Sequence, residues 1–231
     1  RPPRSTLDRS SAASDVYKRQ IFNPDTIPEI VRKAVRISRS EKPGAVLIEL
    51  PEDVARQKTF SKPIAPRRYR RSVPDMTVIK EATDLLIRSK RPLIIAGNGC
   101  IRKRASEQLR RLCDFSQIGV VSSFMAKGCV DMNADYCLFT IGLGARDRIS
   151  KVIDSADLII TLGLDMVEYP PKLWNTDNTK PIVHADFLPA EIDENYHPAL
   201  ELIGDLAQTI SAIAQQAEEK NYRVKDKSGY S

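Results

Sequence analysis

Histidine and cysteine, the side chains that most often bind transition metals, are scarce in this sequence. It has two histidines and four cysteines, and no two of the cysteines form a CxxC pair. A free cysteine usually behaves as a small buried hydrophobe. We therefore predict buried free thiols, rather than metal ligands or redox groups, at all four positions: Cys100, Cys113, Cys129 and Cys137.

Long hydrophobic runs are missing as well. No stretch approaches the roughly 18 to 20 apolar residues that a membrane helix needs, and the first residues lack the apolar core and cleavage site of a secretory signal. The 231-residue chain is 42% hydrophobic and 29% charged, which is typical of a globular protein. We expect a cytoplasmic protein without a membrane partner.

The net charge of +6 does not lie on the patterned part of the chain. Residues 1–20 carry +3 and residues 53–75 carry +5, which leaves −2 for the rest. A nucleic-acid-binding domain concentrates positive charge on a folded face. We therefore predict no nucleic-acid partner.

Both ends of the sequence differ from its middle. Residues 1–20 have no hydrophobic periodicity, and their string SAASDVYKRQ resembles translated sequencing-adapter read-through. We interpret them as a non-native tail, with a genuine disordered N-terminus as the alternative. Residues 219–231 are polar, and we interpret them as the start of a linker to a missing domain.

Two segments precede the regular part of the chain. Within residues 21–52, a helical pattern at 26–38 is followed by a short apolar run at 45–50 that is typical of a buried parallel strand. This pair is too small to enclose a core, so we interpret it as the remnant of a larger domain. Residues 53–75 are rich in Arg, Lys and Pro, which predicts an extended linker.

Between residues 76 and 218, helical patterns alternate with short apolar strands. This alternation predicts an α/β domain with a doubly wound parallel sheet, of Rossmann-like type. About five strands are expected, at residues 92–96, 118–122, 158–162, 181–185 and 200–203.

Ligands of an open parallel sheet bind beyond the carboxyl ends of its strands. Gly97-Asn98-Gly99 follows a strand and precedes a helix, as a phosphate-binding loop requires, but it lacks a third glycine, and a tight turn is the alternative. Asp186 offers an acceptor to a ribose hydroxyl or caps the following turn. The candidates for a vestigial nucleotide-type pocket are Gly97, Gly99, Ser122, Gly142 and Asp186.

The sequence shows no catalytic constellation. Ser122 and Ser123 have no histidine nearby in sequence to activate them. His184 lies within a predicted strand, where we expect a hydrogen-bonded buried residue. Arg146, Asp147 and Arg148 lie in the first turn of a predicted helix. We interpret them as solvated surface charges, and the alternative is that they bind a ligand phosphate. We predict no catalytic residue and no metal ligand.

Three strings resemble the central domain of acetolactate synthases, which are thiamine-diphosphate-dependent enzymes. The similarity is strongest to the catabolic, FAD-independent type, because the flavin-containing type usually has Arg-Phe-Asp-Asp where this chain has Asp165-Met166-Val167-Glu168. Another string, KPGAVLIELPEDV, resembles the end of the pyrimidine-binding domain of such enzymes. The resemblance covers residues 21–218. The three central strings are ADLIITLGLDMVEYPPKLWN, IVHADFLPAEIDENYHP and ELIGDLAQTI.

The resemblance implies that the parent enzyme condenses two pyruvates to 2-acetolactate and CO2, using thiamine diphosphate and Mg²⁺, as a homodimer or homotetramer. The family's activating glutamate and its metal and diphosphate motif belong to other domains, so we expect this fragment to be inactive by itself. FAD is not expected. The alternatives are another thiamine-diphosphate carboligase, of the glyoxylate carboligase or sulfoacetaldehyde acetyltransferase type, and a non-catalytic nucleotide-binding or assembly module.

Overall fold

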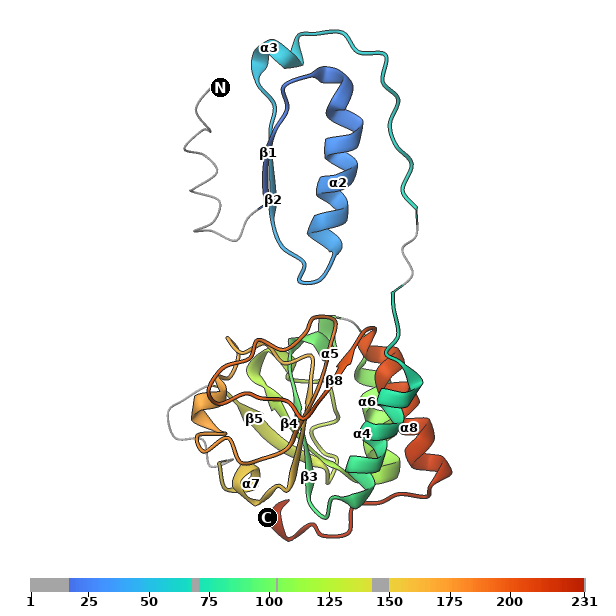
Figure 1. The fold of residues 1–231 in the computed structure, drawn as a ribbon, viewed down its shortest axis with the longest axis vertical. Helices are drawn as coiled ribbons and strands as arrows, with labels where there is room; N and C mark the ends of the chain where they lie inside the picture. The colour runs from blue at the N-terminus through green and yellow to red at the C-terminus, as the bar shows by residue number, and fades with distance from the viewer. Residues whose placement is uncertain (1–16, 68–70, 103, 143–149, 231) are drawn as a thin grey trace. The chain divides into compact units, whose positions relative to one another are not determined.

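The chain folds into two compact units, Arg1–Arg70 and Arg71–Ser231 (Figure 1). The structure is a computed structural model that describes residues 17–67, 71–102, 104–142 and 150–230. The boundary between the units falls inside the segment 53–75 for which the sequence predicts a linker. Within the described residues, no helix has both the length and the apolar character needed to cross a membrane.

The first unit is a two-stranded parallel sheet with helix α2 packed on it. The predicted helix and strand are present as α2 and β2, but β2 is only partly buried and not the buried strand that its apolar run predicts. The described part of the predicted tail, residues 17–20, forms β1 instead. Backbone pairing with β2 needs no hydrophobic periodicity, which is why the pattern of the sequence does not reveal this strand. The elements are β1 (Tyr17–Gln20), η1 (Pro24–Thr26), α2 (Ile27–Arg39), β2 (Val46–Glu49) and α3 (Glu52–Ala55).

The second unit is built on a six-stranded, all-parallel sheet with the order β5-β4-β3-β6-β7-β8. Numbered from the first strand of this unit, the order is 3-2-1-4-5-6, which is that of doubly wound dinucleotide-binding sheets. The predicted fold class is therefore confirmed. The strands are β3 (Pro92–Ala96), β4 (Gly119–Ser123), β5 (Cys137–Ile141), β6 (Leu158–Leu162), β7 (Ile182–Asp186) and β8 (Leu200–Ile203).

One of these six strands, β5, is missing from the sequence-based prediction. It lies at the edge of the sheet, and its pairing with β4 shifts register between Val120 and Ser122. Phe139 in its middle has a φ of 83° and is 75% exposed. Its residues, CLFTI, nevertheless form a short apolar run with one threonine, as those of β6, LIITL, also do, so the sequence carries a signal for this strand that the prediction does not use.

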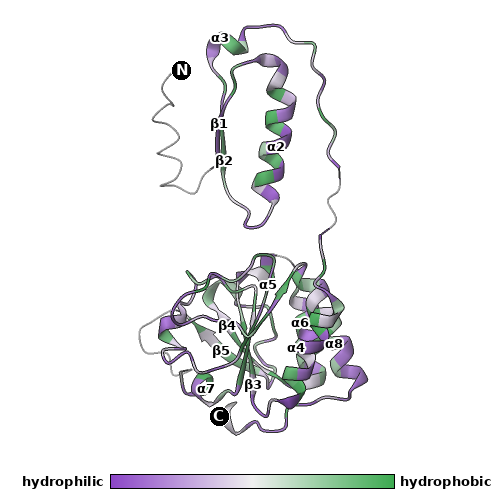
Figure 2. Cartoon of the chain, in the orientation of Figure 1, coloured by the Kyte–Doolittle hydropathy of each residue, from purple (hydrophilic) through white to green (hydrophobic). Residues whose placement is uncertain are grey.

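Two apolar cores lie on the two faces of this sheet. Ile94 and Ile160 belong to the core beneath α4, α6 and α8, whereas Ile95 and Ile159 belong to the other core, as the alternation of strand residues requires. Figure 1 shows α4, α6 and α8 gathered on one side of the strands, and Figure 2 shows the strands in hydrophobic colours between helices of mixed colour. The helices are α4 (Met76–Arg88), α5 (Asn98–Arg102), α6 (Ser106–Ser116), η2 (Phe124–Ala126), α7 (Ser150–Ser155), η3 (Pro171–Leu173), α8 (Leu206–Glu219) and η4 (Ser228–Tyr230).

Asp157, just before β6, fixes the turn between α4 and β3. Its carboxylate accepts hydrogen bonds from the backbone amides of Lys90 at 2.8 Å and Arg91 at 2.9 Å, and from the Ser89 hydroxyl. Burial by itself raises the pKa of the Asp157 carboxyl, but these hydrogen bonds outweigh it and hold the pKa below its usual range. The turn is therefore stabilised by the ionised form of Asp157.

The four cysteines are free, as predicted. Cys100, Cys113 and Cys129 are buried, and Cys137 on the edge strand is half-buried. Burial raises the pKa of the Cys100 and Cys113 thiols well above the usual value and that of Cys129 to about 11. These thiols are therefore protonated at neutral pH and poorly reactive.

The segment that enters the second unit is anchored at the carboxyl end of β8. The Arg71 guanidinium lies 3.1 Å from an Asp205 carboxylate oxygen and 5.2 Å from the centre of the Phe187 ring. The Asp205 amide also donates to the Ser72 carbonyl at 2.8 Å. The chain therefore reaches α4 along the sheet edge at which ligands of this fold bind.

Candidate functional site

β3 and β6 end side by side at the point where the strand order reverses, which is the ligand crevice of doubly wound sheets. In this chain the two loops that leave these strands are bonded directly to each other. The Gly97 amide donates to the Leu162 carbonyl and the Gly99 amide donates to the Gly163 carbonyl, both at 2.9 Å. The backbone donors that a bound phosphate would use at this turn are thus taken up by the neighbouring loop.

The glycines of these loops allow the two backbones to approach closely. A Cβ atom on Gly97 would lie 2.3 Å from the Gly163 carbonyl oxygen, and one on Gly99 would lie 2.6 Å from the Gly163 Cα atom. Gly163 itself has a φ of +57°, in the left-handed region that favours glycine. The space beside Gly97 and Gly99 is therefore filled by protein backbone.

Glu168 closes the remaining opening between the strand ends. The Asn98 amide at the start of α5 donates to both of its carboxylate oxygens at 3.0 Å, and the Asp165 amide lies 3.4 Å from one of them. The hydroxyl of Ser123, at the end of β4, donates to the same carboxylate. Glu168 is only 8% exposed, so this carboxylate is a buried acceptor shared by groups that follow three neighbouring strands.

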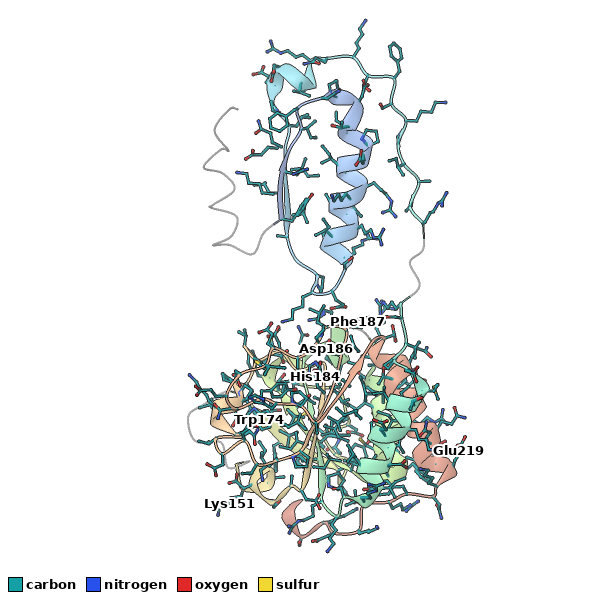
Figure 3. The ribbon with its side chains drawn as sticks, viewed as in Figure 1. Lys151, Trp174, His184, Asp186, Phe187 and Glu219 are labelled. Carbon is teal, nitrogen blue, oxygen red and sulfur yellow. The ribbon has the colours of Figure 1, made fainter. Side chains whose placement is uncertain are left out.

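The other predicted pocket residues lie at the same edge of the sheet, each with a partner in the protein. The Ser122 hydroxyl is 3.2 Å from the Thr140 hydroxyl on the adjacent strand, and an Asp186 carboxylate oxygen accepts from the Phe187 amide at 2.6 Å. Gly142 has a φ of +95°, and a Cβ there would lie 2.9 Å from the Glu168 carbonyl oxygen. Asp186 and Phe187 are labelled in Figure 3. Ligand binding by these residues stays a prediction.

His184 belongs to a buried hydrogen-bond network with Thr161 and Tyr196. Its Nε2 atom is 3.1 Å from the Leu188 carbonyl oxygen, which can only accept, so a neutral ring carries its proton there. Nδ1 then accepts from the Tyr196 hydroxyl at 2.8 Å, and that hydroxyl accepts from Thr161 at 2.7 Å. The prediction of a hydrogen-bonded, buried histidine is confirmed, since His184 is 5% exposed.

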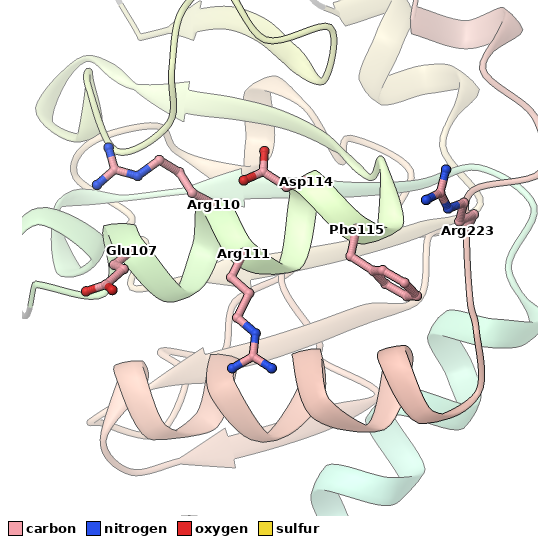
Figure 4. A pocket seen from close by; sticks show the side chains of 6 residues that line it. All are labelled: Glu107, Arg110, Arg111, Asp114, Phe115 and Arg223. Carbon is pink, nitrogen blue, oxygen red and sulfur yellow. The ribbon is translucent and has the colours of Figure 1, made fainter.

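One surface concavity lies away from the strand ends, between α6 and the segment after α8 (Figure 4). Two of its three arginines already have partners. Arg111 donates to both Glu218 carboxylate oxygens, at 2.9 and 2.7 Å, and the Arg223 guanidinium lies 5.7 Å from the centre of the Phe115 ring. The lining residues are Glu107, Arg110, Arg111, Asp114, Phe115 and Arg223.

Some predicted positions lie outside the described residues. These are the charged residues Arg146, Asp147 and Arg148. Of the functional residues that the structure does describe, sequence reasoning named Glu168 only as a departure from a flavin-type string. A signal was available, because an acidic residue shortly after β6 lies at the switch point once the strand order is known.

This architecture defines a doubly wound α/β domain of nucleotide-binding type whose ligand crevice is filled by its own chain. The chain belongs to the thiamine pyrophosphate enzyme family, because the family model of the central domain matches residues 79–213. The family that the sequence predicts is therefore confirmed.

Curated relatives agree with this assignment. An acetolactate synthase of Bacillus subtilis is 31% identical over 205 residues, which cover 87% of this chain and 36% of the relative. One of Mycobacterium bovis is 32% identical over 194 residues, 82% of this chain and 31% of the relative. A chloroplastic acetolactate synthase of Nicotiana tabacum is 27% identical over 212 residues, which cover 89% of this chain and 32% of the relative. The chain thus spans about a third of the length of the curated relatives it matches.

The residues that the structure describes do not fit the cofactor groups associated with such enzymes. Across 17–67, 71–102, 104–142 and 150–230, no three His, Cys, Asp or Glu side chains are placed to hold a metal ion. At the switch point, the Glu168 carboxylate and the Gly163 backbone fill the space in which a nucleotide phosphate would lie. No chemical step is therefore assigned to residues of this chain.

Proposed function

We propose that this chain is the central scaffold of a thiamine-diphosphate-dependent acetolactate synthase, whose whole protein condenses two pyruvates to 2-acetolactate with release of CO2. The identity of 31 to 32% to proteins named acetolactate synthase, over more than four fifths of the chain, carries this proposal. The bound cofactor would supply the electron sink for decarboxylation. This chain would hold the parts that bind it, through a rigid sheet with two apolar cores.

We further propose that the 231-residue chain is catalytically silent by itself. Two observations support this: the relatives are about three times as long, and the buried polar groups at the strand ends bond to each other. Ser123 donates to Glu168, and His184 is bonded at both ring nitrogens. Neither side chain is placed as an activated nucleophile or base with an open approach for substrate.

The test compares two proteins under the same conditions. The product of the full-length gene should form acetolactate from pyruvate when thiamine diphosphate and Mg²⁺ are present, and the 231-residue chain should form none. Turnover by the short chain would contradict its silence. A full-length protein that ignores pyruvate but uses glyoxylate or sulfoacetaldehyde would favour the rival carboligases.

The domain is also proposed to work without FAD, as a spacer between catalytic domains. The filled switch point supports this view, because the Gly163 and Leu164 backbone occupies the space beside Gly97 in which a phosphate would bind. After incubation with FAD and desalting, the purified chain should retain no flavin absorbance. Retained flavin, or micromolar heats with FAD, ADP or NAD in calorimetry, would favour the alternative of a nucleotide-binding module.

A further inference from the structure

We propose that Glu168 is the residue that keeps the switch-point crevice closed. Its carboxylate ties together the ends of β3, β4 and β6 and occupies the position that an anionic ligand group would need. This inference deepens the proposed function, on which it rests for its biological meaning, because it names the side chain that makes the domain unavailable to a nucleotide.

The donors around Glu168 come from parts of the chain that only the fold brings together. Asn98 is 70 residues before Glu168 in sequence and Ser123 is 45 residues before it, and each follows a different strand. Both oxygens of the carboxylate are engaged. A buried carboxylate that receives donors from three loops links them to one another, so its removal leaves these donors unsatisfied and removes the link that joins the end of β4 to the other two loops.

The closure is rigid because the backbone around Glu168 is fixed as well. Its amide donates to the Asp165 carbonyl at 2.9 Å, which closes a tight turn directly after β6. Its carbonyl oxygen packs against Gly142, where even a methyl group would not fit. The backbone that carries the side chain is therefore fixed, and the hydrogen bonds of Asn98 and Ser123 hold the carboxylate itself in place. A phosphate oxygen that approached the Asn98 amide would meet these carboxylate oxygens at contact distance.

The test replaces Glu168 and asks whether an added anion restores what was lost. In Glu168→Ala the carboxylate is removed and its donors face a cavity, while Glu168→Gln keeps the shape without the charge. Glu194→Ala, at an exposed position, is the matched control. Thermal unfolding is followed by Trp174 fluorescence, and binding is followed by calorimetry with inorganic pyrophosphate and with acetate.

The expected result is a lowered melting temperature for Glu168→Ala that acetate or pyrophosphate partly restores, with no such effect on wild type or Glu194→Ala. Pyrophosphate should bind Glu168→Ala at least about tenfold more tightly than wild type, which is about 1.4 kcal/mol. Glu168→Gln should be destabilised with weaker rescue, because its amide group turns a donor toward the Asn98 amide. If Glu168→Ala does not fold in plain buffer, refolding in acetate is the readout.

Two outcomes would overturn the inference. One is a Glu168→Ala protein as stable as wild type and insensitive to both anions, and the other is wild type binding pyrophosphate as tightly as the variant. Either result leaves the acetolactate proposal untouched, because that proposal is tested by turnover of the full-length protein. Flavin retained by wild type would overturn both this inference and the proposal that the domain works without FAD, because a nucleotide would then bind while Glu168 is in place.

Discussion

Replacing Gly97 with alanine tests whether the Gly97-Asn98-Gly99 turn serves packing rather than ligand binding. The new Cβ would lie 2.3 Å from the Gly163 carbonyl oxygen and 2.4 Å from the Leu164 Cα atom. Both contacts are with backbone, so no side-chain rotation can relieve them. β3 and β6 would have to separate at their carboxyl ends.

The cost can be worked out from two contributions. Overpacking a well-packed site costs about 1 to 3 kcal/mol. Separation of the strands also breaks the bond from the Gly97 amide to the Leu162 carbonyl, and an unsatisfied buried group costs about 1 to 3 kcal/mol. We expect a loss of about 4 kcal/mol, a large part of the roughly 5 to 15 kcal/mol that stabilises a domain.

Urea unfolding followed by Trp174 fluorescence measures this loss. Trp174 is the single tryptophan of the chain and is 4% exposed in the second core, so its emission reports this unit alone. For a slope of about 2 kcal/mol/M, the midpoint should fall by about 2 M. Gly128→Ala is the control, because Gly128 has a positive φ of +90° but nothing within 4 Å of the added Cβ. It should lose only about 1 kcal/mol. A Gly97→Ala protein no less stable than this control would show that the turn does not need glycine for packing.

Three further predictions concern buried or capping groups. Asp157→Asn should lower stability at pH 7 by about 0.5 to 1 kcal/mol, because the asparagine keeps one acceptor oxygen and residue 157 is exposed to solvent as a whole. Since folding lowers the pKa of Asp157, this stabilisation is complete above the unfolded value of about 3.9 and is lost as the pH falls through the folded value. The difference in urea midpoints should therefore shrink as the pH falls below about 3.9. Tyr196→Phe should cost about 1 to 3 kcal/mol in the same assay, because His184 loses its donor. A disulfide reagent at pH 8 should label at most about one thiol quickly, at Cys137, and all four only after denaturation.

The sequence is most informative where periodicity and burial coincide. The strand at Leu158–Leu162 is buried at every position, and its bounds match those that the apolar run predicts. The prediction misses β5 although its residues, CLFTI, form a comparable apolar run; its edge position, register shift and exposed Phe139 are evident only from the structure. Strand β1 is likewise invisible, since its four residues are joined to β2 through backbone groups that every residue type shares.

Candidate site residues are predictable in location but not in role. Gly97, Gly99, Ser122, Gly142 and Asp186 were chosen because they follow or end strands, and all five lie at the carboxyl edge of the sheet. What each residue touches depends on strand order, which the sequence pattern alone does not reveal. The contacts of Gly97 with Gly163 and of Ser122 with Thr140 require the pairings of β3 with β6 and of β4 with β5.

The strand order explains why the loops at this crevice can either bind a ligand or form hydrogen bonds with each other. In a sheet of this order, the loops after the first and fourth strands must meet at the switch point, whatever residues they carry. If those loops present amides and leave a gap, an anion from outside completes their hydrogen bonds. If the loop after the fourth strand carries a buried acid, as Glu168 does here, the chain completes them by itself. Under the proposal for Glu168, the side chain at this position decides whether the donors of these loops are left for a ligand or are satisfied within the chain.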